Sequence, residues 1–113
     1  MLTVYGIPNC DTVKKTLTWL RENGIEYQFH DYKKQGISPQ KLETWLTQTD
    51  WQTLINRAGS TWRQCSEEQK AAVQDAQSAT ALMLEKPSVV KRPVIEKENK
   101  IIKIGWKPVG LDE

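Results

Sequence analysis

The sequence is poor in cysteine and histidine. It has two cysteines, Cys10 and Cys65, and a single histidine among 113 residues. Neither cysteine belongs to a C-x-x-C pair, because Val13 occupies the third position after Cys10. Cysteines so few and so far apart argue against a disulfide framework and against a structural zinc site. We therefore expect no bound metal.

The chain also lacks a long hydrophobic run and an excess of charge. No apolar stretch approaches the ~20 residues of a membrane-spanning helix, and the chain opens on a predicted strand rather than on a basic and apolar leader. Sixteen basic and fourteen acidic residues leave a formal net charge of +2, too balanced to indicate a nucleic-acid surface. We expect a cytoplasmic protein that binds neither membranes nor nucleic acid. Its length and 38% hydrophobic content predict a single domain over residues 1–113, present as a monomer.

Cys10 stands where a predicted strand gives way to a predicted helix. Strand-forming residues precede Gly6 and Pro8, and apolar residues then recur at helical spacing at Val13, Leu17 and Leu20. A thiol at a helix N-terminus faces unpaired amide groups and the positive end of the helix dipole, both of which favour the thiolate. We predict that Cys10 is a nucleophile. The alternative is an inert buried thiol.

Cys65 and His30 have weaker signals. Cys65 immediately precedes Ser66, and Ser66 and Gln69 have the S-x-x-Q spacing of a capping box, so we place Cys65 in a loop. It could resolve a disulfide on Cys10 if the fold brought the two together, but sequence separation does not give that distance. His30 falls on the more polar side of a predicted strand, as an ordinary surface or strand-edge residue, and we assign it no role.

The remaining pattern predicts the order of elements. Gly24 ends the first helix, alternation over residues 25–32 predicts a strand, and residues 33–36 form a loop. Ser38 and Pro39 begin the next helix. Short helices fill residues 50–86, with Gly59 as a stop, and a hairpin turns at residues 97–99. This order predicts an α/β sheet whose first unit is a right-handed βαβ crossover, followed by a β-hairpin.

Three segments carry a resemblance that covers nearly the whole chain: residues 5–15 (YGIPNCDTVKK), 56–63 (NRAGSTWR) and 91–94 (KRPV). In them the sequence resembles the arsenate reductase (ArsC) family, whose members include the Spx regulators and YffB-type reductases. The resemblance implies a thioredoxin-like core with an all-helical insertion over about residues 38–86. It also implies a catalytic Cys10 beside an Arg92-Pro93 turn, with Pro93 in the cis form.

The resemblance is uneven at the positions that bind an oxyanion. Arsenate-reducing members surround their cysteine with three arginines, of which Arg92 matches one. The second falls on Asn56, with Arg57 one step later, and the third falls on Lys107. Lysine lacks the planar fork of arginine and asparagine has no charge, so arsenate reduction is not expected. These departures resemble the YffB-type branch, considered glutathione-dependent thiol reductases. From the same resemblance we expect the family's C-terminal helix to be short or missing after Val109.

A single activated cysteine can attack a disulfide and form a mixed species that a second thiol must resolve. Without a C-x-x-C partner, the simplest second thiol is external, and we expect glutathione or a small oxidised thiol as substrate, with glutaredoxin as a further partner. The acidic ends of glutathione suit basic side chains, although Lys14 and Lys107 could equally be solvated surface charges. The predicted site has Cys10 as its catalytic residue and binds glutathione through Asn9, Lys14, Arg92, Pro93 and Lys107.

Two non-enzymatic alternatives stay open. The Spx regulators bind RNA polymerase and use a thiol pair as a redox switch, but Val13 removes the second thiol here. A domain of this shape could also bind a partner through exposed aromatic residues such as Trp62 or Trp106, although tryptophans are more often buried or half-buried.

Overall fold

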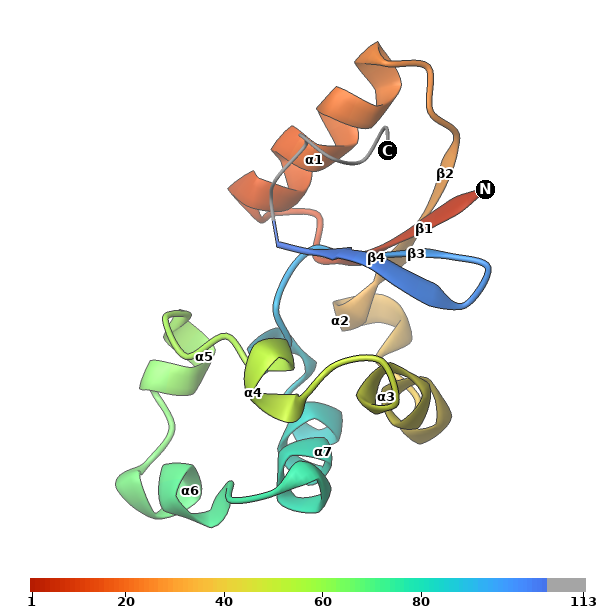
Figure 1. Ribbon diagram of the computed structural model, residues 1–113. Coiled ribbons are helices and arrows are strands. Elements are labelled where there is room, and N and C mark those ends of the chain that lie inside the picture. Colours follow the sequence, from red (N-terminus) through yellow and green to blue (C-terminus); the bar gives the residue numbers. More distant parts are fainter. Residues whose placement is uncertain (106–113) are drawn as a thin grey trace. The chain divides into compact units, whose positions relative to one another are not determined.

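The structure is a computed structural model in which residues 1–105 are described. The chain divides into two compact units (Figure 1). Met1–Gln35 and Arg92–Glu113 form the first, here called the sheet unit, and Gly36–Lys91 form the second, the helical unit. Across the described part of the chain, no helix is both long and apolar enough to cross a membrane. That the whole chain is one domain stays a prediction.

The sheet unit holds a four-stranded sheet in the order β2-β1-β3-β4. The first two strands are parallel, β3 runs antiparallel to β1, and β4 runs antiparallel to β3. This arrangement confirms the predicted βαβ unit followed by a hairpin. Its elements are β1 (Leu2–Gly6), α1 (Asp11–Glu22), β2 (Tyr27–Asp31), α2 (Tyr32–Gln35), β3 (Val94–Lys97) and β4 (Lys100–Ile104).

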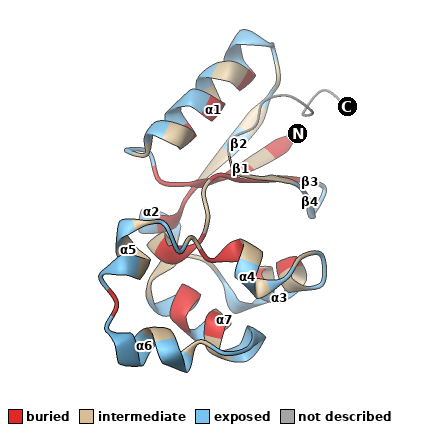
Figure 2. Ribbon diagram, turned by 60° about the vertical axis from the view of Figure 1, so that its left-hand side comes forward, coloured by how far each residue is buried: buried red, intermediate tan, exposed pale blue. Residues whose placement is uncertain are grey.

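One face of the sheet packs against α1. Leu2, Val4 and Ile95 form a buried cluster with Leu20 of α1, and the buried residues of these elements are red in Figure 2. Side chains alternate between the two faces of a strand, so Tyr5 belongs to the opposite face. The helix ends as predicted, since Gly24 has a φ of +67°, which favours glycine.

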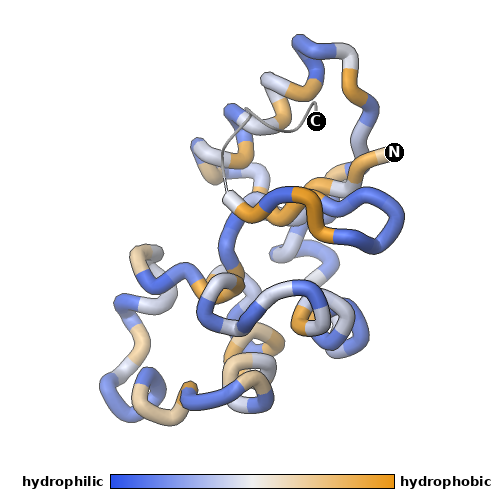
Figure 3. Tube along the Cα trace, in the orientation of Figure 1, coloured by the Kyte–Doolittle hydropathy of each residue, from blue (hydrophilic) through white to orange (hydrophobic). Residues whose placement is uncertain are grey.

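The hairpin joins β3 to β4 through Glu98 and Asn99, both of which have positive φ values. Paired positive φ values match the twist of a two-residue hairpin turn. The turn is hydrophilic, and it separates strands with strongly hydrophobic residues (Figure 3). Gly105, at the end of β4, donates a backbone hydrogen bond of 2.8 Å to the carbonyl of Pro93, which ties the end of the hairpin to its beginning.

The helical unit contains short helices with clear caps. Ser38 caps its helix at the amide of Lys41 with Pro39 in the first turn, as predicted. The Ser66 and Gln69 capping box is also present, and the core contains fully buried residues such as Trp45 and Met83. The elements are α3 (Pro39–Leu46), α4 (Trp51–Leu54), α5 (Ser60–Arg63), α6 (Glu67–Ala72), α7 (Ala76–Glu85) and the 3-10 turn η1 (Pro87–Val89).

Two local predictions were wrong. The strand predicted over residues 25–32 ends at Asp31, and residues 32–35 form α2 rather than a loop. The carboxylate of Asp31 accepts a hydrogen bond from the amide of Lys33 at 2.9 Å, which starts the turn. Gly59 does not stop a helix but is the N-cap of α5. Its amide donates a hydrogen bond of 3.2 Å to the carbonyl of Asn56. A Cβ at Gly59 would lie 2.8 Å from Nδ2 of Asn56.

Candidate active site in the sheet unit

Cys10 is the N-cap residue of α1. Its backbone is extended, with φ −98° and ψ 125°, and its carbonyl accepts the first helical hydrogen bond from the amide of Lys14 at 2.9 Å. The side chain is half-buried and makes no capping hydrogen bond to the helix. The N-cap position puts Cys10 at the end of α1 that carries the free amide groups and the positive end of the helix dipole. The predicted position of Cys10 at the start of a helix is confirmed.

A close contact between Gly6 and Val13 fixes the loop that carries Cys10. Gly6 ends β1, and a Cβ added there would lie 2.7 Å from Cγ2 of Val13, which is fully buried in α1. Only a residue without a side chain lets the end of β1 approach the helix this closely. Between them, Pro8 and Asn9 are exposed. The predicted site residue Asn9 thus borders Cys10 on the accessible side of the loop.

The sheet register places Arg92 and Pro93 beyond the C-terminal end of β1, where the loop that carries Cys10 begins. Val94 pairs with Tyr5, the residue before Gly6. The two residues before Val94 therefore lie beyond the end of β1, in the direction of the loop over residues 7–10 (Figure 1). The Arg92-Pro93 bond is cis, Pro93 is buried and Arg92 is half-buried. The C-terminal end of β2 lies at the same end of the sheet, because Gly6 pairs with Asp31.

Lys14 is exposed one turn along α1 from Cys10. With Lys15 it borders a shallow surface hollow of about 360 Å³, which Trp19 also lines. The structure thus brings Asn9, Lys14, Arg92 and Pro93 to the same end of the sheet unit as Cys10. Lys107, Trp106 and the segment after Val109 lie outside the described residues.

The other predicted positions belong to the helical unit. Cys65 lies in the loop between α5 and α6, as predicted, is only 5% exposed, and its thiol donates to the carbonyl of Thr61 at 3.4 Å. The amide of Asn56 donates to the carbonyl of Val89 at 2.9 Å, and Arg57 lies over the ring of Trp51 at 5.7 Å. Trp62 is half-buried rather than exposed. A resolving role for Cys65 stays a prediction.

The sequence analysis missed a buried polar cluster on the sheet face opposite α1. The hydroxyl of Tyr5 donates a hydrogen bond of 2.8 Å to Oε1 of Glu96, which is 3% exposed. Burial, this hydrogen bond and the charge of Glu96 raise the pKa of Tyr5. His30 lies on the edge strand β2, as expected, but it is half-buried with its ring 4.8 Å from that of Tyr5. The polar residues that alternate with apolar ones in these strands were the available signal.

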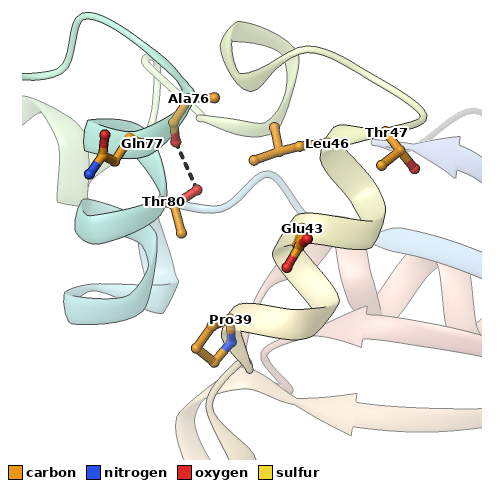
Figure 4. Close-up of a pocket in the computed structure, with 7 residues that line it drawn as sticks. All are labelled: Pro39, Glu43, Leu46, Thr47, Ala76, Gln77 and Thr80. Atoms are coloured by element: carbon orange, nitrogen blue, oxygen red, sulfur yellow. Dashed lines mark hydrogen bonds between the residues drawn. The ribbon is translucent and has the colours of Figure 1, made fainter.

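A groove in the helical unit offers no comparable chemistry. It has a volume of about 430 Å³ and lies between α3 and α7 (Figure 4). Its two hydroxyl-bearing residues donate to backbone carbonyls, Thr47 to Thr44 at 2.6 Å and Thr80 to Ala76 at 2.8 Å. Its one ionisable side chain is Glu43. Residues 1–105 contain no group of three side chains able to hold a metal ion. Cys10 and its surroundings are therefore the candidate active site.

Comparison with known proteins gives a consistent result. The sequence model of the ArsC family matches residues 5–113. A solved structure named YffB shares 46% identity and superposes with a TM-score of 0.88 over 96% of this chain and 93% of its own. An arsenate reductase (ArsC) related protein from Brucella melitensis is 50% identical, with a TM-score of 0.78 over 95% of this chain and 88% of its own. The regulatory protein MgsR of Bacillus subtilis is 26% identical over 97% of this chain and 86% of its own length.

Proposed function

This chain belongs to the ArsC family, and we propose that it is a thiol reductase in which Cys10 is the nucleophile and glutathione is the second thiol. The observation that carries the proposal is the position of Cys10, half-buried at the N-cap of α1 with a side chain not used in capping. A helix N-terminus attracts negatively charged groups, and the thiolate is the form of a cysteine that attacks a disulfide. No other cysteine lies in the described part of the sheet unit.

The reaction takes place by two thiol exchanges. The Cys10 thiolate attacks the glutathione sulfur of a mixed disulfide between glutathione and a substrate thiol, forming a disulfide between Cys10 and glutathione and releasing the substrate as its thiolate. A second glutathione thiolate then attacks the glutathione sulfur held on Cys10. Oxidised glutathione leaves and the Cys10 thiolate is restored, so one glutathione thiol is consumed for each mixed disulfide reduced.

The side chains around Cys10 suit a substrate with carboxylates. Arg92 can bind a carboxylate through two parallel hydrogen bonds, which lysine cannot reproduce. In this proposal Lys14 and Lys107 supply further positive charge for the carboxylates, and Asn9 and Pro93 complete the glutathione-binding set. Asn56 and Lys107 replace arginines that the resemblance associates with arsenate binding. We therefore propose glutathione, or a glutathionylated small thiol or protein, rather than arsenate as the substrate.

The test is turnover of a glutathionylated peptide with reduced glutathione, coupled to NADPH consumption by glutathione reductase. We expect turnover by the wild-type protein and by Cys65→Ser, and none above the uncatalysed rate by Cys10→Ser. Arsenate in place of the peptide should give little or no turnover. Turnover that survives Cys10→Ser but not Cys65→Ser would overturn the assignment of the nucleophile.

A regulator is the second candidate, because the similarity to MgsR covers almost the whole chain. A regulator of the Spx type would capture subunits of RNA polymerase and would not turn over a mixed disulfide. Val13 leaves Cys10 without a neighbouring thiol for an internal switch. Stoichiometric capture of polymerase subunits, together with an absence of glutathione-dependent turnover, would favour the regulator over the reductase.

A further inference from the structure

The buried hydroxyl of Tyr32 has no evident structural role. It is the first residue of α2, directly after the end of β2, and it is 1% exposed. Its hydroxyl oxygen is enclosed and has no hydrogen-bond partner in the part of the chain that the structure describes. Burying a hydroxyl without a partner lowers stability, and phenylalanine would fill the same space without that cost. An unsatisfied group of this kind calls for an explanation.

The residues near Tyr32 include Arg92 of the candidate active site. Its ring lies 6.3 Å from the ring of Tyr5, which donates to Glu96, and 6.2 Å from that of His30. Burial, then the charge of Tyr5, raise the pKa of Tyr32. The positive charge of Arg92 lowers this pKa, and the negative charge of Glu96 raises it. Arg92 is therefore close enough to Tyr32 for its charge to act on the hydroxyl.

The strand register independently supports this proximity. Asp31, the residue before Tyr32, pairs with Gly6 at the end of β1. Val94, two residues after Arg92, pairs with Tyr5, which precedes Gly6. The start of α2 and the start of β3 thus lie beyond the same end of the central strand β1. Tyr32 follows β2 and Arg92 precedes β3, the two strands on either side of β1.

We propose that Tyr32 is a positioning residue for Arg92, whose guanidinium donates a hydrogen bond to the buried Tyr32 hydroxyl when Arg92 holds a carboxylate of glutathione. This inference rests on the proposed function of Arg92. Arginine has five N–H donors, and a carboxylate held by two of them leaves others that need acceptors. A neutral hydroxyl can accept without cancelling the charge that holds the carboxylate. Since Tyr32 is 1% exposed, it acts through Arg92 and does not touch the substrate.

The test compares two disulfides that react with Cys10 in the same way but differ in charge. Oxidised glutathione carries carboxylates, and 2-hydroxyethyl disulfide carries none. We expect the wild-type protein to react faster with oxidised glutathione than with 2-hydroxyethyl disulfide. Arg92→Lys and Tyr32→Phe should each lower the rate with oxidised glutathione by about tenfold, which corresponds to the free energy of one hydrogen bond to a charged group. In each variant the rate with oxidised glutathione should therefore fall relative to the rate with 2-hydroxyethyl disulfide, which offers no carboxylate to Arg92. The double variant should lose little more than Arg92→Lys alone.

Two controls separate positioning from a purely structural role. Tyr27→Phe makes the same change at an exposed hydroxyl, which accepts from Nη1 of Arg21 at 2.9 Å, and should leave both rates unchanged. Denaturant unfolding should show Tyr32→Phe to be at least as stable as the wild type, because the hydroxyl that it removes has no partner in the described structure. In turnover, Tyr32→Phe should raise KM for the glutathionylated substrate and leave kcat nearly unchanged.

Three results would overturn the inference. In the first, Tyr32→Phe keeps the wild-type preference for oxidised glutathione while Arg92→Lys loses it. In the second, Tyr32→Phe slows both disulfides equally, as a general loss of structure would. In the third, the wild-type protein shows no preference, which removes the role of Arg92 and this inference with it. Turnover that requires Cys10 would still support the thiol reductase in all three cases.

Discussion

The hydroxyl of Tyr5 donates a hydrogen bond of 2.8 Å to Oε1 of Glu96, a residue 91 positions further along the chain. Tyr5 lies on β1 and Glu96 on β3, and both are buried, at 6% and 3% exposed. The bond joins the strand that leads to Cys10 with the strand that follows Arg92 and Pro93. It is therefore a link between the two segments that form the candidate active site.

Replacing Tyr5 by phenylalanine tests the strength of this link. The change removes the donor and leaves Oε1 of the buried Glu96 without this hydrogen bond. Loss of one partner from a buried pair costs about 1–3 kcal/mol, and we expect the free energy of unfolding to fall by that amount in urea denaturation. Tyr27→Phe, which removes an exposed hydroxyl, should change it by less than about 0.5 kcal/mol. Equal effects of the two variants would contradict the buried link.

Replacing Gly6 by alanine tests the close approach of β1 to α1. The new Cβ would lie 2.7 Å from Cγ2 of Val13, so the loop or the helix must move. Overpacking of this kind costs about 1–3 kcal/mol, and we expect a lower free energy of unfolding together with slower modification of Cys10. In a Val13→Ala background the same substitution should cost clearly less, because the clashing methyl is gone. An equal cost in both backgrounds would show that this contact is not what limits position 6.

The cap of α7 predicts a pH dependence of stability. The carboxylate of Asp75 accepts from the amide and the hydroxyl of Ser78, both at 2.8 Å. These bonds hold the pKa of Asp75 below its ordinary value of 3.8. A carboxyl whose pKa is lowered by folding stabilises the folded state above its unfolded pKa, and this contribution is lost as the pH falls through the folded value.

We therefore expect the wild type to unfold at higher denaturant than Asp75→Asn at pH 7, and the gap to narrow as the pH falls below 3.8. The asparagine variant isolates Asp75 from Asp50, whose pKa is lowered in the same direction by Thr53. Chemical denaturation at several pH values provides the measurement. A gap that does not change between pH 7 and pH 3 would contradict a charged cap.

The two cysteines should differ in their reaction with iodoacetamide. Cys10 is half-buried, whereas Cys65 is 5% exposed and donates to the carbonyl of Thr61. In the native protein at neutral pH we expect Cys10 to be modified within minutes and Cys65 only after denaturation. Peptide mass spectrometry gives the modified residue. Modification of Cys65 before Cys10 would contradict the reported burial of these thiols.

Local sequence rules predicted the elements whose signals are local. Gly6 and Pro8 before an amphipathic run placed Cys10 at a helix start, and Ser38 with Pro39 placed the start of α3. The order of the elements along the chain, with the hairpin at its end, followed from alternation and turn residues. Gly59 was misread because a glycine can begin a helix as well as end one, and the choice depends on a contact with Asn56. The short helix α2 depends on hydrogen bonds that the side chains of Asp31 and Gln35 accept from backbone amides, and periodicity does not reveal these.

The candidate site was predicted only in part for a similar reason. A thiol at a helix N-terminus is a local feature, whereas the pairing of Tyr5 with Val94 and the bond from Tyr5 to Glu96 join residues far apart in the chain. Alternation alone places Tyr5 and Glu96 on strands but does not pair those strands. The resemblance to the ArsC family, and not any spacing, placed Arg92 beside Cys10. The proximity of Tyr32 to Arg92 had no sequence signal.

The central claim is that Cys10 is the sulfur that exchanges with glutathione, and mass spectrometry of the intact protein and its peptides after treatment with oxidised glutathione tests it most directly. Wild-type protein and Cys65→Ser should each gain one glutathionyl group on Cys10, and Cys10→Ser should gain none. A glutathionyl group on Cys65, or an unmodified Cys10 in folded wild-type protein, would contradict the account.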